Sequence, residues 1–236
     1  MAENAKKLNV KKRIIIWVII ILVIAAGVYL FFNWRSIKAR LSADSSAPIP
    51  VQTGETDTNI LVVYFSLGEN SNVDAISSAS VTAIDKVAYG NVRVIADEIS
   101  KNTGGELFSV IQEKKYDASY TSVVDVAKQE QNDDTRPVLT THIKSLDKFD
   151  TIFIGYPTWW TDLPQGMYTF FDEYDLSGKT IIPFNSANGS AEAGTVDTIK
   201  KLEPNAEVVD KCLSIDQGDI EDCADTVKNW LNELGY

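Results

Sequence analysis

Short apolar runs alternate with stretches of helical periodicity along most of this chain, and this alternation limits the possible folds more than any other feature. Each apolar run is rich in β-branched or aromatic residues, as is typical of strands buried on both faces of a sheet. Five such alternations predict one α/β domain with a five-stranded parallel sheet, right-handed crossovers and helices on both faces. The predicted strands are 60–65, 106–111, 151–154, 179–184 and 207–213, and the predicted helices are 92–101, 123–131, 164–173, 195–202 and 220–234.

An uninterrupted run of 19 apolar residues, 14–32, precedes the predicted domain. As a helix it would span roughly 28 Å, close to the hydrocarbon thickness of a bilayer. It is longer than the apolar core of a cleaved secretory signal, which has about 7–15 residues, so we expect a retained transmembrane helix. Trp17, Tyr29 and Trp34 lie near its ends, where aromatic belts form.

The charges beside this run predict its orientation. Five basic residues precede it and three follow it, which predicts a cytoplasmic amino terminus and an extracytoplasmic domain in a single-pass protein of the cell membrane. Residues 42–58 are rich in Ser, Ala, Pro, Thr and Asp, a composition typical of a flexible tether. The chain therefore divides into a basic segment 1–13, a transmembrane helix 14–32, a linker 33–58 and a folded domain 59–236.

Charge and residue usage exclude several classes of function. Beyond residue 43 the chain has 14 basic and 32 acidic residues, a net charge of −18, so its general field excludes nucleic-acid binding. This charge serves solubility or steers a basic partner towards the domain. Cys212 and Cys223 lack metal-ligand spacing and His142 is the only histidine, so no metal site or His-based triad is predicted. We expect two buried thiols and a surface histidine.

Two adjacent tryptophans follow the third predicted strand. Pro157 ends the strand, and Trp159 and Trp160 then lie in a loop. Loops beyond the carboxyl ends of parallel strands bind ligands in open α/β sheets, and two indoles there indicate a flat aromatic ligand held by stacking. Alternatively, one tryptophan caps the core and the other covers a neighbouring helix. This stretch alone favours neither interpretation.

Three motifs, each at the end of a predicted strand, resemble those of the flavodoxin family. They are Val-Val-Tyr-Phe-Ser at 62–66, Gly-Tyr-Pro-Thr-Trp-Trp at 155–160 and Ser-Gly-Lys-Thr-Ile-Ile-Pro-Phe at 177–184. The resemblance covers residues 59–236. It implies a flavodoxin-like three-layer sandwich with strand order 2-1-3-4-5, and a non-covalent FMN at the carboxyl edge of the sheet.

The resemblance also implies where the FMN phosphate lies. A phosphate needs backbone N–H donors and a helix amino terminus rather than necessarily a lysine. Val92 stands where the family usually has a hydroxyl residue, and Glu69 brings a negative charge close to the phosphate, which Arg93 is expected to offset. The implied phosphate-site residues are Ser66, Gly68, Asn70, Asn91 and Val92.

The isoalloxazine ring is expected between two loops, 158–160 and 185–190, with Trp159 or Trp160 stacked on it. Ala187 and Asn188 stand where the family often has a histidine and a glycine, so the ring edge is expected to differ from that of its relatives. The implied ring-site residues are Pro157, Thr158, Trp159, Trp160, Asn185, Ser186, Ala187 and Gly189.

Residues 73–82 resemble a second pattern, the sequence on which FMN transferases attach FMN through a phosphoester. The resemblance makes Ser80 the acceptor hydroxyl and Asp74 a recognition residue. The alternative is a loop rich in Ser and Ala that covers the phosphate site.

Three functions remain open from the sequence. The first is a membrane-held FMN redox protein that passes electrons to a partner protein or a small-molecule acceptor through an exposed ring edge. The second is an FMN-dependent oxidoreductase of the NAD(P)H:quinone type, with a pocket roofed by Tyr116, Tyr120 and the tryptophan pair. The third is an exported binding domain that has lost FMN. No side chain is predicted to act as a general acid or base.

Overall fold

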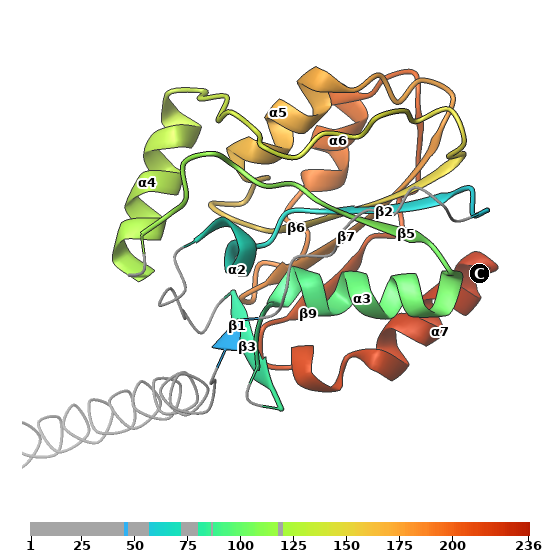
Figure 1. Cartoon of the computed structure of the whole chain (residues 1–236), viewed down its shortest axis with the longest axis horizontal. Helices are drawn as coiled ribbons and strands as arrows, with labels where there is room; N and C mark the ends of the chain where they lie inside the picture. Colours follow the sequence, from blue (N-terminus) through green and yellow to red (C-terminus); the bar gives the residue numbers. More distant parts are fainter. Residues whose placement is uncertain (1–44, 47–56, 72–79, 86, 118–119) are drawn as a thin grey trace, which may run out of the picture.

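A parallel sheet lies between two layers of helices (Figure 1). The computed structural model describes residues 45–46, 57–71, 80–85, 87–117 and 120–236. The predicted transmembrane helix and most of the predicted linker lie outside these residues. Among the residues described, no helix is both long and apolar enough to cross a membrane.

The main sheet has the strand order β5, β2, β6, β7, and both β8 and β9 pair with β7 at the far edge. Its strand pairs are parallel, as predicted. The order corresponds to 2-1-3-4-5 when β8 and β9 share the fifth position. The strands are β2 (Ile60–Tyr64), β5 (Glu106–Ser109), β6 (Thr151–Pro157), β7 (Thr180–Ala187), β8 (Glu207–Val208) and β9 (Leu213–Asp216).

The prediction of five continuous strands is wrong at this edge, because the fifth strand is broken. Thr180 pairs with Glu207 and Phe184 with Leu213, so four steps along β7 oppose six steps along the edge. The two extra residues bulge outward in a turn, where the amide of Cys212 donates to the carbonyl of Asp210 at 3.0 Å. An edge position tolerates such a break because, within the described part of the chain, no further strand pairs on its other side.

Alternate residues of each central strand feed two separate cores. In β2, Leu61 and Val63 belong to one core, while Val62 and Tyr64 belong to the other, as the pleat of a strand requires. Helices α5 and α6 cover the first core and α3 and α7 the second (Figure 1). The long helices are α3 (Asn91–Thr103), α4 (Tyr120–Asn132), α5 (Gln165–Glu173), α6 (Thr195–Leu202) and α7 (Ala224–Leu234).

The predicted helices are confirmed, with small shifts at their ends. Helix α3 ends at Gly104, whose φ of +71° suits glycine in a left-handed cap. Pro164 precedes the first residue of α5. The predicted last helix begins instead with a short 3₁₀ turn, η1 (Ile220–Asp222), before α7.

Three local features differ from the prediction. The predicted loop after the first strand contains a one-turn helix, α2 (Leu67–Asn70). The predicted loop 185–190 begins late, because β7 continues through Ala187. A small second sheet, absent from the prediction, joins β1 (Ser45–Ser46), β4 (Val87–Gly90) and β3 (Val81–Ile84); β1 falls within the predicted tether.

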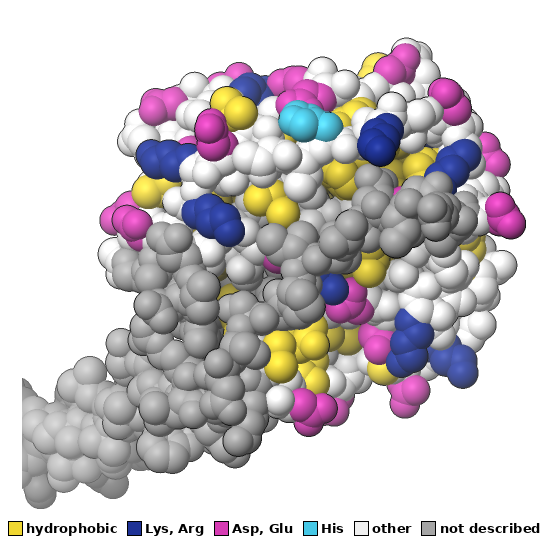
Figure 2. Space-filling model, viewed as in Figure 1, with side chains coloured by type: hydrophobic (Ala, Val, Ile, Leu, Met, Phe, Trp, Pro, Cys, Tyr) yellow, Lys and Arg dark blue, Asp and Glu magenta, His cyan; other side chains and the backbone are white. Residues whose placement is uncertain are grey.

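The histidine lies in the connection between α4 and β6, and the two cysteines directly precede β9 and α7. His142 is exposed on the surface (Figure 2), with Nδ1 3.2 Å from Oε2 of Glu173. Cys223 is buried as predicted, whereas Cys212 lies in the break between β8 and β9 and is only half-buried. Burial raises the pKa of the Cys212 thiol to about 12 and that of Cys223 to about 11.

Candidate functional site

A cavity of about 240 Å³ opens where β6 and β7 end, and helix α4 forms part of its wall. Among the described residues that line it, none carries a charged side chain. Mainly apolar walls with a few polar groups are typical of small-molecule sites, although this volume is slightly below their usual range. The lining residues are Ser80, Val123, Val124, Ala127, Pro157, Thr158, Trp159, Trp160, Ser186, Ala187 and Asn188.

Six of the eight predicted ring-site residues therefore meet at one cavity, and Asn185 and Gly189 do not line it. Asn185 is fully buried, and its amide donates to Oγ1 of Thr158 and, at 2.9 Å, to the carbonyl of Ala191. Asn185 thereby links the loop after β6 to the loop after β7. Gly189 is exposed, and its amide donates to Asp216 at 2.9 Å.

The tryptophan pair packs against neighbouring elements and also lines the cavity. Trp159 packs edge-on against Phe65 and Tyr116, with ring centroids 5.7 and 5.4 Å apart. Trp160 is 47% exposed, and its indole N–H donates to the carbonyl of Val124 in α4 at 3.1 Å. Each indole thus supports a neighbouring element and also lines the cavity.

A tight turn aims Trp160 at α4. Trp159 and Asp162 exchange two backbone hydrogen bonds of 3.0 Å, and the two residues between them, Trp160 and Thr161, have φ of +51° and +62°. Two positive φ values in a two-residue hairpin indicate a type I′ turn, in which Asn-Gly is preferred. Tryptophan and threonine are strained there, and such strain persists when surrounding contacts hold it.

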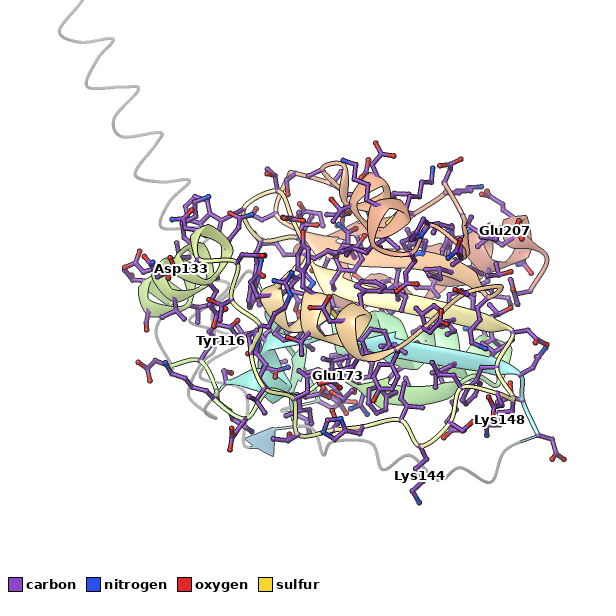
Figure 3. All side chains as sticks on the ribbon, turned by 90° about the horizontal axis from the view of Figure 1, so that it is seen from above. Tyr116, Asp133, Lys144, Lys148, Glu173 and Glu207 are labelled. Carbon is purple, nitrogen blue, oxygen red and sulfur yellow. The ribbon has the colours of Figure 1, made fainter. Side chains whose placement is uncertain are left out.

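Tyr116, which was predicted to roof the pocket, lies behind Trp159 instead, near α4 (Figure 3). Its hydroxyl donates to Oε2 of Glu130 in α4 at 2.6 Å, and the residue is 3% exposed. It supports Trp159 and anchors α4 rather than lining the cavity. The side chain of Tyr120 lies outside the described residues.

The predicted phosphate-site residues gather where β2 meets the start of α3. A Cβ at Gly90 would lie 1.7 Å from Oγ of Ser66, and a Cβ at Gly68 would lie 2.7 Å from the nitrogen of Gly90. Glycines therefore allow the two segments to touch. Oγ of Ser66 is buried and has no hydrogen-bond partner among the residues that the structure describes.

The first turn of an α-helix leaves backbone N–H groups without intrahelical partners and binds anions there. Asn91 and Val92 form that turn in α3. The side chain of Val92 is 1% exposed and belongs to the core, so it contributes only its backbone. The side chain at this position therefore supplies no hydrogen-bond donor to an anion.

Asn70 lies at this site but points inward. Its amide donates to the carbonyls of Ser66 and Val110 at 3.0 and 2.9 Å, and its Oδ1 accepts from the amide of Gln112 at 2.7 Å. The first bond closes the turn after β2, and the other two tie that turn to the segment after β5. Asn70 thus shapes the site through the backbone.

Glu69 also turns away from the phosphate position. Its carboxylate is 7% exposed and accepts from the hydroxyl of Tyr64 at 2.8 Å, from Nη1 of Arg93 at 2.9 Å and from Oγ of Ser109. The expectation that Arg93 offsets Glu69 is confirmed by this ion pair. Burial raises the pKa of the Glu69 carboxyl, although the three donors act in the opposite direction.

Ser80 joins the two halves of the site. It lines the cavity, is 7% exposed, and its carbonyl accepts from the amide of Asn91 at 2.9 Å. The first turn of α3 and the cavity are therefore adjacent. An orphaned hydroxyl at a helix start beside a mainly apolar cavity fits a phosphate joined to an uncharged ring system.

These features agree with the comparison to known proteins, since residues 59–234 match the flavodoxin family profile. The chain belongs to the flavodoxin family. Membership of this family supports FMN as the cofactor. No curated protein matches the chain.

Several solved flavoproteins share this fold. A putative flavoprotein from Bacteroides uniformis is 24% identical, and the match covers 73% of this chain and 97% of that one, with a TM-score of 0.56. One from Bacteroides eggerthii is also 24% identical, over 72% of this chain and 97% of the other, with a TM-score of 0.53. A Lactobacillus acidophilus flavoprotein solved in complex with FMN is 18% identical over 69% of this chain and 96% of that one, with a TM-score of 0.49.

Sequence reasoning missed the contribution of α4 to this flavodoxin site. Val123, Val124 and Ala127 line the cavity. In the sequence, apolar residues at such spacing in a predicted helix indicate a face that packs against the core. No signal in the sequence distinguishes a helix face that packs on a sheet from one that closes a cavity.

Proposed function

We propose that the protein is a membrane-anchored flavodoxin that binds FMN and carries electrons between a donor and an acceptor. The observation that carries this proposal is the junction of an uncharged cavity, lined by Trp159 and Trp160, with the start of α3 beside the orphaned hydroxyl of Ser66. When bound, FMN supplies the redox chemistry. The chain supplies binding, orientation and the surrounding field.

Each half of the site has a distinct role in this proposal. The backbone at the start of α3 and the hydroxyl of Ser66 hold the phosphate. The indoles of Trp159 and Trp160 and the walls from β6, β7 and α4 hold the ring and exclude water. Oγ of Ser186 is buried and unpartnered within the described part of the chain, so it can donate to a ring oxygen or nitrogen. The acidic domain disfavours added negative charge and so lowers the reduction potential.

A titration followed by absorbance and flavin fluorescence tests FMN binding in the detergent-solubilised full chain. We expect the tryptophans to quench flavin fluorescence on binding, with one FMN per chain. A colourless protein that takes up no FMN would contradict the proposal and favour a binding domain that has lost its cofactor.

An FMN-dependent oxidoreductase of the NAD(P)H:quinone type is the second candidate, and one observation favours it. Side chains of α4 line the cavity, so this face of the ring would be covered rather than open to a partner protein. Steady-state oxidation of NAD(P)H with a quinone acceptor separates the two functions. Turnover at rates of about 1 s⁻¹ or more supports the reductase, and its absence favours the carrier.

The membrane anchor is proposed from the apolar run 14–32 and the charges beside it. Fractionation of cells that express the full chain is expected to place it in the membrane pellet. Protease added outside the inner membrane is expected to digest the domain. A soluble chain would contradict the anchor. A domain that resists protease added outside an intact inner membrane would contradict the orientation.

Covalent attachment of FMN at Ser80 is a separate proposal, supported by the resemblance of residues 73–82 to the acceptor sequence of FMN transferases. The buried position of Ser80 in the cavity wall also suits a purely structural role, and Asp74 lies outside the described residues. Intact-protein mass spectrometry after coexpression with an FMN transferase decides between them. An unmodified mass rules out the covalent link.

A further inference from the structure

The proposed phosphate site is built from two segments that are far apart in the sequence. One is the turn Ser66–Asn70 after β2, and the other is the start of α3 at Gly90–Arg93. An anion held by backbone N–H groups from both segments is bound well only when their spacing is correct. The contact between Gly68 and Gly90 allows a close approach, but a contact between two glycines does not by itself hold the segments together.

A buried ion pair connects these two segments. Glu69 lies in the first and Arg93 in the second, with Oε1 of Glu69 2.9 Å from Nη1 of Arg93. Their side chains are only 6% and 10% exposed. Arg93 also pairs with Asp97 one turn further along α3 at 2.6 Å.

The same carboxylate also reaches two strands. Oε1 of Glu69 accepts from the hydroxyl of Tyr64 at the end of β2, and Oε2 accepts from Oγ of Ser109 at the end of β5. The hydroxyl of Tyr64 in turn accepts from Arg93 at 3.1 Å. One carboxylate therefore joins α2, α3 and β2, whose ends form the proposed phosphate site, to the neighbouring strand β5.

Buried charges of this kind are costly unless they are paired, and removal of one partner leaves the other uncompensated. From this geometry we infer that Glu69, through its ion pair with Arg93, is a positioning residue for the FMN phosphate. The inference rests on the proposed function. The carboxylate would then support the binding of an anion, although its charge alone would oppose it.

The two effects of Glu69 have opposite signs, so one substitution separates them. Glu69→Gln keeps the size of the side chain and an oxygen that accepts from Tyr64, but it removes the charge that pairs Arg93 with the turn after β2 and leaves Arg93 paired with Asp97 in its own helix. If Glu69 mainly repels the phosphate, the variant binds FMN more tightly. If Glu69 positions the site, the variant binds FMN more weakly.

Riboflavin, which has the ring but no phosphate, provides the second readout. For Glu69→Gln in the full chain, we expect the dissociation constant for FMN to rise at least tenfold and that for riboflavin to change less than twofold. Glu98→Gln on the outer part of α3 is the matched control, since Glu98 pairs with Lys101 at the surface. Both of its dissociation constants are expected to match the wild type.

A second variant covers the case in which Glu69→Gln does not fold. Ser109→Ala removes one donor to the carboxylate without a change in charge, and we expect a three- to tenfold loss of FMN affinity with riboflavin unaffected. An equal loss of both ligands, or unchanged or tighter FMN binding by either variant, overturns the inference while the proposed function stands. A wild type that binds neither ligand overturns both.

Discussion

Glycine decides how closely the strand ends can approach one another. A Cβ at Gly155 would lie 2.2 Å from the ring of Phe184 in the neighbouring strand, and a Cβ at Gly90 would lie 1.7 Å from Oγ of Ser66. Neither position needs a positive φ; both need the absence of a side chain. The first preserves the core packing of Phe184, and the second preserves the contact at the proposed phosphate site.

Gly90→Ala is therefore expected to push the turn after β2 away from α3. We expect a loss of about 1–3 kcal/mol in the free energy of unfolding from overpacking, and a loss of FMN affinity of more than tenfold. Denaturant unfolding and FMN titration measure the two effects.

Gly104→Ala is the control for this prediction. A Cβ there meets no atom within 4 Å, although the φ of +71° disfavours alanine. The control should lose roughly 1 kcal/mol of stability and retain FMN binding. Equal FMN affinity in both variants would show that the contact with Ser66 does not matter.

The buried carboxyl of Glu203, at the end of α6, is expected to make the free energy of unfolding depend on pH. Burial raises the pKa of its carboxyl from 4.5 to about 7; the charge of Asp175 adds to this, and a hydrogen bond from the backbone of Leu176 acts against it. The folded state therefore holds the proton more tightly than the unfolded chain. The stability from this group is complete below pH 4.5 and is lost as the pH rises through about 7.

We expect the wild type to lose roughly 1–3 kcal/mol of unfolding free energy relative to Glu203→Gln between about pH 5 and pH 8. Urea unfolding at a series of pH values measures this difference. Glu207→Gln, at an exposed site in β8 (Figure 3), is the control and should follow the wild-type curve. Parallel curves for the wild type and Glu203→Gln would refute the prediction.

At the scale of elements, the position of α4 depends on a few contacts with Trp160. The indole donates to the carbonyl of Val124, and Nζ of Lys128 lies 5.0 Å from the centre of its ring. A second tie comes from the hydroxyl of Tyr116 to Glu130. Because the strained turn at 160–161 holds the indole in place, the turn and the helix stabilise each other.

Trp160→Phe keeps an aromatic ring but removes the indole N–H, so it tests this link. We expect the amides of α4 to exchange with solvent roughly 2–10-fold faster, as the loss of about 0.5–1.5 kcal/mol implies. Hydrogen–deuterium exchange with mass spectrometry measures it.

Trp230→Phe removes an equivalent N–H from α7, where the indole donates to the carbonyl of Lys211 at 3.2 Å. Exchange in α7 rather than in α4 is expected to increase in this control. Unchanged exchange of α4 in Trp160→Phe would mean that Tyr116 and the apolar face of the helix suffice to hold it.

At the scale of the whole molecule, the excess of acidic residues repels any anionic ligand. Residues beyond 43 carry a net charge of −18. On the visible face, acidic and basic side chains are interspersed rather than gathered in one patch (Figure 2). The long-range field is therefore negative, while the proposed phosphate site relies on short-range backbone donors.

FMN binding is consequently expected to strengthen with ionic strength, because salt screens the repulsion between the domain and the phosphate. A fall in the dissociation constant of roughly two- to fivefold between low salt and about 0.5 M salt is expected for FMN. Riboflavin, which lacks the phosphate, should show little change. Weaker FMN binding at high salt would instead indicate a cationic site.

The order of helices and strands along the chain could be predicted because each long element has its own hydrophobic periodicity. The helix 195–202 was predicted with the bounds that α6 has, and the central strands were predicted because both of their faces are buried. Predictions failed where an element has no periodic signal of its own. The hairpin of β3 and β4, the turn α2 and the break between β8 and β9 are of this kind.

The candidate site was predicted only in part. The residues at the strand ends, such as Thr158 and Ser186, were identified from motifs and meet at the cavity. The directions of the side chains were not predictable, since Asn70 and Glu69 are polar residues in a polar turn and yet both point inward. Their partners at Val110 and Ser109 lie forty residues away along the chain.

By itself, the sequence determined the layers of this domain and the edge at which a ligand would bind, because burial on two faces and helical periodicity are written into each short segment. The order of the strands followed from the resemblance to the flavodoxin family. Only the tertiary structure decided that Glu69 turns inward to Tyr64 and Ser109, that α4 closes one side of the cavity, and that Trp159 and Trp160 each support a neighbour while they line the site. The reason is physical: hydrophobic periodicity is a local property, whereas the partner of a buried charge and the neighbour of an indole depend on which distant segments the sheet brings together.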